Sequence, residues 1–478
     1  MTASAAAPLS PLSATARAAR PQRSLAPDIA RGLMLALIAI ANVCWFLWGH
    51  EGAVGMTPHV PARGPADTVV QVVMTIAVDH RAMPLFAFLF GYGMVQFYRS
   101  RIDRGMEPRV VRIMLRRRHW AMLLLGFLHA ALLFYGDILG AYAIAGLLLV
   151  WIFFGRRTRT LIIWAGVLGG LLTLFALLSL VSAMVLLLFA PPEVLATTAA
   201  GASPVAPDWV RDMAYAQPYL ISVLTRTGMW IVSSVPAALT AAPLPILLGW
   251  IAARGRLLDE PWRHTRLLRR IAVGGIAIGW LGGLPDALLI AGALPLPETL
   301  GWAFAGVNAV GGMCCGVGYA AAFGLLAVRL ERREVAAEAP AATTGRAERR
   351  ALRAQQAAAH AALSPAERAY GEPAASPVPA PAAAPQGVAR ALAAVGQRSL
   401  TFYLFQSLLL APLMASWGLG LAPQLSTASA VGIAFGVWLL SLPIAAWMDA
   451  RGMRGPAERL LRRLTYGRHD RPAGAARP

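Results

Sequence analysis

The chain has 478 residues, of which 57% are hydrophobic and 14% charged, and its mean hydropathy is +0.57. Soluble domains carry about 25% charged residues, so this composition excludes a simple water-soluble globule. The formal net charge is +20, and all 43 basic residues are arginine. Because these arginines form short clusters between apolar runs, they are typical of membrane topology signals. We expect a lipid bilayer as partner and no nucleic acid.

Residues 1–27 are rich in Ala, Ser and Pro and predict a disordered cytoplasmic tail. No small-residue cleavage site follows the first apolar run, which favours an uncleaved anchor. Residues 28–330 predict a membrane domain with the first eight spans, each near the length of about 20 residues that a bilayer requires. The expected spans, with the last two further along the chain, are 29–48, 83–98, 119–135, 138–154, 161–189, 228–252, 271–291, 302–328, 399–417 and 428–448.

Every second loop between these runs is basic, which places the basic loops and both termini in the cytoplasm. The sequence therefore predicts an all-α fold, a polytopic integral membrane bundle of about ten transmembrane helices. We expect a multi-pass protein of the bacterial inner membrane. The prolines within or beside the runs predict kinked or interrupted helices; they are Pro84, Pro236, Pro243, Pro245 and Pro285.

Residues 331–395 are rich in Ala, Pro and Arg and predict a disordered cytoplasmic linker. A short helix through Ala347–Ala362 within it, acting as a spacer or docking element, is the alternative to a fully solvated linker, which the composition favours. Residues 396–467 hold the last two spans and a basic end, and residues 468–478 form a tail.

Polar residues mark both ends of the first span. Asp28 and Arg31 lie three residues apart at its start, where they can pair on one helix face or support a site. Asn42 follows in the same run, as a hydrogen-bonding group between helices or as a site residue. His50 comes next on the outer side and is either a loop histidine or a general base.

The run from residue 119 to 154 carries His129 inside it and Asp137 at its turn, where Gly136 permits a tight reversal. His129 is either a neutral imidazole bonded to a neighbouring helix or a catalytic base. Asp137 suits an N-cap as well as a site. Arg81 could neutralise Asp137 or hold an anionic group at the outer surface.

Three further polar residues lie in later runs and either line a polar cavity or hold helices together; they are Asp286, Asn308 and Gln406. The three cysteines, Cys44, Cys314 and Cys315, have no metal-ligand spacing, so no metal site is expected.

Six blocks in order, PDIARG, RAMPLFAFLFGYG, LLGFLHAALLFYGDILGAYAIAGLLL, LPILLGWIAARGRLL, VGQRSLTFYLFQSLLL and RGMRGPAERLLRRLTYG, carry a family resemblance. From about Ser24 to Gly467 the chain resembles the YeiB-like bacterial membrane family, a domain of unknown function. That family is distantly similar to membrane acyltransferases of the heparan-glucosaminide acetyltransferase type. Their Asp-x-x-Arg-Gly block is matched by Asp28, Arg31 and Gly32.

The resemblance also bears on the reactive group. Glycan acyltransferases place a histidine late in the first span, where this chain has Asn42. Heparan-type enzymes have an asparagine there and a reactive histidine shortly afterwards, which resembles Asn42 followed by His50. The resemblance thus implies an acyltransferase with His50 or His129 as base.

The physical argument for such an enzyme starts from the donor. Acyl-CoA is polyanionic, and the arginines of the cytoplasmic loops, above all Arg116, Arg117 and Arg118, can bind its phosphates as a co-substrate site. No permanently bound cofactor is expected. The acceptor would be a glycan or a small molecule outside the cytoplasm, and a homodimer is compatible with the sequence. The alternative is a proton-coupled transporter, for which the broken helices and the intramembrane Asp286 and His129 are suited.

Overall fold

The computed structural model describes residues 25–51, 57–191, 193, 208–294, 296, 300–338 and 387–466. In these ranges all regular structure is helical, which confirms the all-α prediction. The helices are α1 Ala26–Val43, η1 Cys44–Phe46, α2 Pro65–Ala77, α3 Ala82–Ile102, α4 Pro108–Leu132, α5 Leu139–Phe153, α6 Thr158–Phe189, α8 Asp208–Tyr215, α9 Tyr219–Thr240, α10 Pro243–Arg254, η2 Pro261–Arg263, α11 Thr265–Ile290, α12 Trp302–Glu338, α15 Gly387–Gln397, α16 Ser399–Met414, η4 Ala422–Gln424, α17 Thr427–Ala450 and α18 Pro456–Tyr466.

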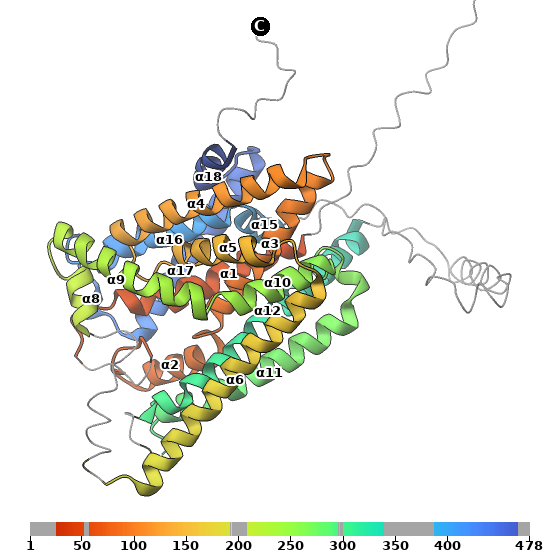
Figure 1. Ribbon diagram of the computed structural model, residues 1–478. Coiled ribbons are helices and arrows are strands. Elements are labelled where there is room, and N and C mark those ends of the chain that lie inside the picture. Colours follow the sequence, from red (N-terminus) through yellow and green to blue (C-terminus); the bar gives the residue numbers. More distant parts are fainter. Residues whose placement is uncertain are drawn as a thin grey trace, which may run out of the picture. The chain divides into compact units, whose positions relative to one another are not determined.

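The segments Leu25–Leu330 and Gln386–Pro478 cluster into one compact unit. Near its centre lies α1, in contact with α3, α15, α16 and α17 (Figure 1). Most residues of α1 are buried, because this helix is apolar on nearly every side. The first span therefore serves as the axis around which the later helices pack.

Within the described residues, seven helical segments are long and apolar enough to cross a membrane. They are Ala26–Phe46, Pro65–Ile102, Thr158–Phe189, Tyr219–Thr240, Thr265–Ile290, Trp302–Leu330 and Thr427–Ala450. Three shorter apolar helices, α5, α10 and α16, fall below that length. The first half of α4 is rich in arginine, which lowers its mean hydropathy although the helix has 25 residues.

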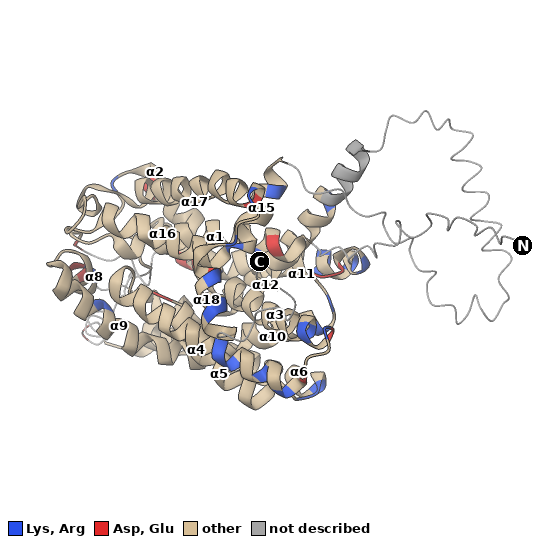
Figure 2. Ribbon diagram, turned by 90° about the horizontal axis from the view of Figure 1, so that it is seen from above, with Lys and Arg blue, Asp and Glu red and all other residues tan. Residues whose placement is uncertain are grey.

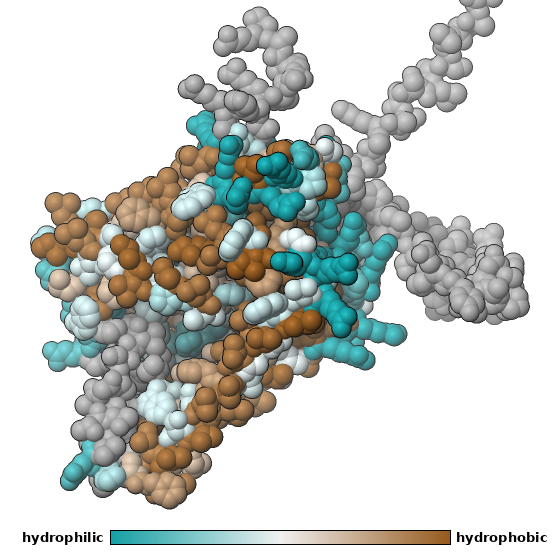
Figure 3. All heavy atoms as spheres, in the orientation of Figure 1, coloured by the Kyte–Doolittle hydropathy of each residue, from teal (hydrophilic) through white to brown (hydrophobic). Residues whose placement is uncertain are grey.

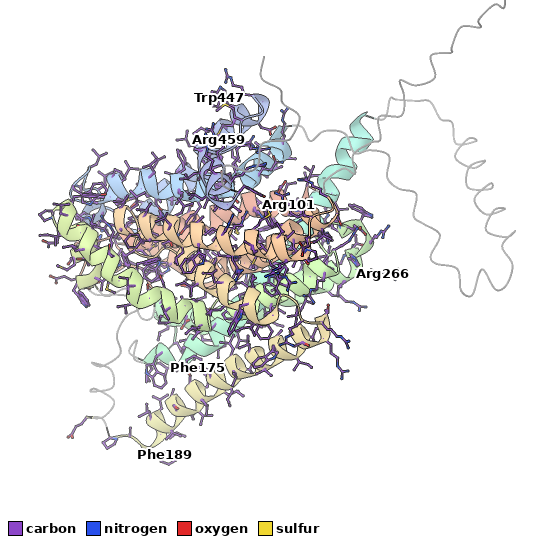
Figure 4. The ribbon with its side chains drawn as sticks, turned by 45° about the horizontal axis from the view of Figure 1, so that its top comes forward. Arg101, Phe175, Phe189, Arg266, Trp447 and Arg459 are labelled. Carbon is purple, nitrogen blue, oxygen red and sulfur yellow. The ribbon has the colours of Figure 1, made fainter. Side chains whose placement is uncertain are left out.

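Helix α6 shows which surface is apolar. Only 17% of its most hydrophobic stretch is buried, and brown residues mark its surface in Figure 3. Phe175 and Phe189 on this helix are exposed, and Phe189 lies at its far end (Figure 4). Exposure of an apolar surface of this length to water is unfavourable, whereas a lipid bilayer solvates it.

The expected span 228–252 is two helices. Helix α9 ends at Thr240 and α10 begins at Pro243, with a turn at Ala241 and Ala242. Proline lacks an N–H group and is favoured in the first turn of a helix, so Pro243 fits this start. The interruption that the prolines predict is therefore present here.

Close contact between helices depends on small residues at several crossings. On α3, a Cβ atom added to Gly91 would lie 2.5 Å from the carbonyl oxygen of Ile246 on α10. On α10, a Cβ on Gly249 would lie 2.2 Å from the carbonyl oxygen of Phe88. Reciprocal glycines of this kind let two helix backbones approach closely, as in membrane helix pairs.

The predicted linker 331–395 is shorter in the structure than the sequence suggests. Helix α12 continues to Glu338, and α15 begins at Gly387 and packs on α1 and α17. The alternative helix at 347–362 and the residues 1–24 and 467–478 lie outside the described residues. Arginines stand out at α18, beside α15 and at the ends of α5 and α6 (Figure 2).

Candidate functional site

A buried carboxylate joins four helices at the turn between α4 and α5. The Nδ1 atom of His129 lies 2.8 Å from Oδ1 of Asp137, and both side chains are almost fully buried. Oδ2 of Asp137 accepts a hydrogen bond from the backbone N–H of Gly140 at 2.8 Å. The hydroxyl of Tyr403 and the indole N–H of Trp230 also donate to this carboxylate, at 3.1 and 3.3 Å. Four donors thus compensate its burial in an apolar region.

The hydrogen bond to Asp137 orients the imidazole of His129. An ionised carboxylate is only an acceptor, so Nδ1 of His129 carries the hydrogen in this pair. Nε2 is buried and has no hydrogen-bond partner among the described residues. In the neutral imidazole, Nε2 then holds a free lone pair, which is the arrangement of a general base oriented by a carboxylate.

The end of α4 is fixed by a second buried charge. Arg226 on α9 donates to the carbonyl oxygens of Ala131 and Leu132 at 3.0 and 3.3 Å, and to that of Ala214 at 2.8 Å. The last carbonyl groups of a helix have no partner within it, and a cation there also suits the helix dipole. The turn that carries His129 is therefore held rigidly.

Asp137 was predicted to cap the N-terminus of the helix that follows it, and its carboxylate does accept a hydrogen bond from the first turn of α5. Helix α5 begins at Leu139, one residue later than predicted, and Asp137 bonds the N–H of its first turn. Gly126 on α4 makes this crossing possible, because a Cβ there would lie 2.5 Å from the backbone nitrogen of Gly140.

His119, on the same helix as His129, is a useful contrast. Its Nδ1 lies 2.7 Å from the carbonyl oxygen of Leu115, and its Nε2 has no partner among the described residues. However, the Nε2 edge of the ring presses against Gly146, where a Cβ would come within 2.4 Å. In the described part of the chain this histidine has no carboxylate partner, and Gly146 leaves no room beside Nε2, so we assign it to packing.

A second buried polar cluster lies between α3, α11 and α12. Arg81 donates to Oδ1 of Asn308, to the carbonyl oxygen of Asp79 at 2.5 Å and to that of Gly279 at 2.7 Å. The amide of Asn308 donates to Asp286 at 2.6 Å. The expected pairing of Arg81 with Asp137 is therefore wrong, because the guanidinium is engaged in this separate network.

The segment that precedes α2 adds His59 to this region. Nε2 of His59 lies 2.9 Å from Oδ2 of Asp79, and Nδ1 lies 3.5 Å from Sγ of Cys44. Burial lowers the pKa of His59, but the carboxylate of Asp79 and the hydrogen bonds to Asp79 and Cys44 outweigh it and raise this pKa to about 10. His59 is thus an imidazolium paired with Asp79 at neutral pH.

The other predicted residues lie elsewhere. Arg31 pairs with Asp28 at 3.2 Å and donates to Gln96 on α3 at 3.2 Å. Nε2 of His50 lies 3.0 Å from the carbonyl oxygen of Ala422, outside the His129 cluster.

Gln406 joins helices and does not accompany Asp286 or Asn308, since its amide donates to the carbonyl oxygen of Leu35 at 2.9 Å. Asn42 is half-buried on α1. Arg116 and Arg117 are exposed, and Arg118 lies over the ring of Phe97, 5.8 Å from its centroid. Among the described residues, no group of three or more His, Cys, Asp or Glu side chains could hold a metal ion.

Several residues of these clusters were not predicted. Tyr403, Trp230 and Arg226 come from α9 and α16, and their sequence neighbourhoods give no sign of a shared partner. Asp79 had a weak signal, because Asp79, His80 and Arg81 are three consecutive ionisable residues between two apolar runs. Such a triplet at membrane depth is costly and points to internal pairing.

The fold and this buried polar interior define a multi-pass helical membrane protein. The family model described as a protein of unknown function (DUF418) matches residues 252–347 and 379–468. Over these two segments, which make up less than half of the chain, the chain resembles this family, as the sequence blocks indicated. Tyr403, Asp286 and Asn308 lie within the matched residues.

Two bacterial relatives are also similar to this chain. The uncharacterised protein YxaH of Bacillus subtilis (strain 168) is 28% identical over 277 residues, which are 53% of this chain and 63% of that protein. An uncharacterised 39.9 kDa protein in the amylase 3' region of Bacillus acidopullulyticus is 32% identical over 124 residues, which are 26% of this chain and 32% of that protein. Both alignments cover less than two thirds of the relative's own length. No solved structure matches the chain significantly.

Proposed function

We propose that this protein is an acyltransferase of the bacterial inner membrane, which moves an acyl group from cytoplasmic acyl-CoA to an acceptor outside the cytoplasm. The observation that carries the proposal is the His129 and Asp137 pair. A carboxylate fixes Nδ1 of His129, while Nε2 is buried and unpartnered among the described residues. An acceptor hydroxyl or amine placed at Nε2 would lose its proton there as it attacks the acyl carbon.

The proposal includes a topology. Ten spans with both termini in the cytoplasm would put Arg116, Arg117 and Arg118 at the cytoplasmic face and the α4–α5 turn toward the outer face. From Arg118 to His129 the helix rises roughly 16 Å at 1.5 Å per residue. The flexible pantetheine arm of an acyl-CoA can bridge such a distance, with its phosphates held by guanidinium groups.

The donor end is supported by more than the exposed arginines. Arg101 and Arg118 both lie over the ring of Phe97, 4.8 and 5.8 Å from its centroid, so α3 and α4 bring two guanidinium groups together. Arg101 also bonds the hydroxyl of Tyr466 on α18. Arg101 and Arg459 mark this region in Figure 4.

The test is acyl-CoA turnover by the purified full-length chain in liposomes, with acetyl-CoA as probe and free CoA thiol as readout. We expect His129→Gln to lower turnover by about 10²-fold or more, since a general base contributes 10²–10⁴-fold. The matched control is His119→Gln, which removes a buried imidazole from the same helix and leaves turnover unchanged.

Two results would contradict the proposal. Loss of turnover in His50→Gln with full turnover in His129→Gln would move the base to His50. Absence of acyl-CoA binding and turnover in the unmodified chain would remove the enzyme proposal.

A proton-coupled carrier is the second candidate, because the cluster of Asp79, Arg81 and Asp286 lies inside two candidate spans. Buried ionisable groups at such depth are typical of proton relays. A carrier would respond to an imposed pH gradient with solute movement in liposomes, and Asp286→Asn would abolish that response. The enzyme predicts no such movement.

A further inference from the structure

A thiol, an imidazole and a carboxylate contact one another in succession at the end of the first span. The imidazole of His59 stands between Sγ of Cys44, at 3.5 Å from Nδ1, and Oδ2 of Asp79, at 2.9 Å from Nε2. All three side chains are buried. The proposed reaction at His129 uses none of them.

The loop that carries His59 is held from several directions. Thr57, Pro58, His59 and Val60 are all buried, which is unusual for a connection on the outer side. Arg211 on α8 donates to the carbonyl oxygen of Pro58 at 3.1 Å, and Gln71 on α2 donates to that of Val60 at 2.7 Å. These two hydrogen bonds hold the backbone on both sides of His59 without involving its imidazole. The imidazole is therefore not needed to fix the position of this segment.

The order of groups is that of an activated cysteine. A nucleophile within hydrogen-bond reach of a base, with that base oriented by a third group, is the general signature of covalent catalysis. Thiols paired with a cationic imidazole are the ones that react as nucleophiles in proteins. A structural His–Asp pair would require only two of these three members.

From this arrangement we infer that Cys44 is a second reactive group of the protein, a nucleophile that takes the acyl group from the donor as a thioester before the acceptor receives it. The inference rests on the proposed acyl transfer. Phe46 follows Cys44 by two residues and stacks on Phe134, with centroids 4.8 Å apart; Phe134 lies 6.2 Å from the ring of His129. The cysteine and the proposed base therefore border the same aromatic cluster.

The exchange balances without any redox partner. Sγ of Cys44 attacks the carbonyl carbon of the acyl-CoA as a thiolate, with its proton already held on the imidazolium of His59 beside Asp79. The bond from that carbon to the CoA sulfur breaks, and the CoA thiolate takes this proton and leaves as free CoA. The acceptor hydroxyl then attacks the Cys44 thioester while His129 takes its proton, the Cys44 thiolate leaves, and the proton passes from His129 through water to His59.

The chain offers its own control for this step, because Cys44 is accompanied by only two further cysteines, Cys314 and Cys315. The full-length chain with Cys314→Ala and Cys315→Ala is incubated with radiolabelled acetyl-CoA, quenched in acid and digested. We expect label on the peptide that contains residue 44, released by neutral hydroxylamine, and its loss in Cys44→Ala. Cys44→Ser keeps the shape of the site, and its label, an oxyester, resists hydroxylamine.

A donor-independent arm uses methyl methanethiosulfonate, a small neutral thiol reagent. The inference predicts that Cys44 reacts faster than Cys314 and Cys315, and that His59→Gln slows it by about 10-fold or more. Folding of this variant is checked by its gel-filtration profile, and Asp79→Asn serves as a second variant with the same expected direction.

The outcomes separate the two proposals. If acetyl-CoA is turned over while Cys44→Ala keeps full activity and carries no label, the inference is overturned and the acyltransferase stands. If acetyl-CoA is not turned over but Cys44 reacts fast in a His59-dependent way, acyl transfer fails and the nucleophile stands. Equal thiol reactivity with and without His59 overturns the nucleophile.

Discussion

Two of the buried polar clusters among the described residues differ in how their hydrogen-bonding groups are satisfied. At the α4–α5 turn, four donors converge on Asp137, and the imidazole of His129 is left with an unpartnered Nε2. Between α3, α11 and α12, Arg81 and Asn308 donate hydrogen bonds to acceptors within their own network. There, the atom without a partner among the described residues is Nε of Arg81, a donor whose guanidinium already makes three bonds.

This difference in hydrogen bonding distinguishes a cluster that stabilises the helix packing from one that can take part in a reaction. A network whose acceptors are all bound by donors fixes the positions of helices, and removing one member leaves a charge buried without compensation. An oriented imidazole with a free acceptor atom has instead kept the capacity to take a proton. We therefore assign the Arg81 cluster to stability and the His129 cluster to function.

The largest expected effect concerns Arg81. Arg81→Leu removes the donor that binds Asn308 and two backbone carbonyls, and leaves these three buried acceptors without it. Each buried acceptor left unsatisfied costs about 1–3 kcal/mol. Thermal unfolding in detergent should show a large fall in Tm or no recoverable folded protein. An unchanged Tm, with the exposed Arg156→Leu as reference, would refute the stabilising role.

The pH dependence of stability tests the ion pair of His59 with Asp79, which lies beside Arg81. Since the pKa of His59 is raised from 6.5 to about 10, its ion pair with Asp79 stabilises the fold fully below pH 6.5 and loses this contribution as pH rises toward 10. His80 and Arg81 also lie near Asp79 and are part of its electrostatic surroundings. Tm should fall from pH 6.5 to 10 in the unmodified chain. In His59→Gln the same scan should be flatter; an identical slope would contradict the assignment.

Gly126→Ala tests the crossing that builds the His129 site. The new Cβ would lie 2.5 Å from the nitrogen of Gly140 and 2.7 Å from Oδ2 of Asp137, so α4 and α5 must move apart. Overpacking of this kind costs about 1–3 kcal/mol, and turnover should fall with it. Gly169→Ala on α6, where a Cβ meets nothing within 4 Å, is the control. Equal behaviour of the two variants would show that the crossing is not tight.

The smallest expected effect is that of Tyr403→Phe. It removes one of four donors to Asp137, a loss of about 1 kcal/mol, and leaves the ring beside His129, where the centroids are 5.0 Å apart. Tm should drop slightly and turnover should fall less than in His129→Gln. Complete loss of turnover would instead make the Tyr403 hydroxyl a reacting group.

Much of the fold could be predicted because apolar runs and arginine clusters are local signals. Asp137 as a capping residue and the Asp28 and Arg31 pair were readable for the same reason, since both depend on spacing within one helix or turn. The link between His129 and Asp137 was not, because it depends on where α4 ends and how the turn folds back. Arg81 was assigned the wrong partner because its choice is set by α11 and α12, about 200 residues away in sequence.

Helix α15 shows a different limit. Its sequence, GVARALAAVGQ, continues an Ala-rich and Pro-rich stretch and looks like linker. It is helical because it packs on α1, where a Cβ on Gly32 would lie 2.3 Å from the carbonyl oxygen of Leu392. Tertiary contact, not local propensity, decides such a segment.

The assignment of one cluster to function and the other to stability is tested most directly by measuring acetyl-CoA turnover per folded protein together with Tm in His129→Gln and Asn308→Leu. We predict that His129→Gln loses turnover by about 10²-fold or more with little change in Tm. Asn308→Leu should lower Tm, by roughly 1–3 kcal/mol of stability, while the protein that remains folded keeps its turnover. The reverse pattern, turnover lost with Asn308 and retained without His129, would contradict the account.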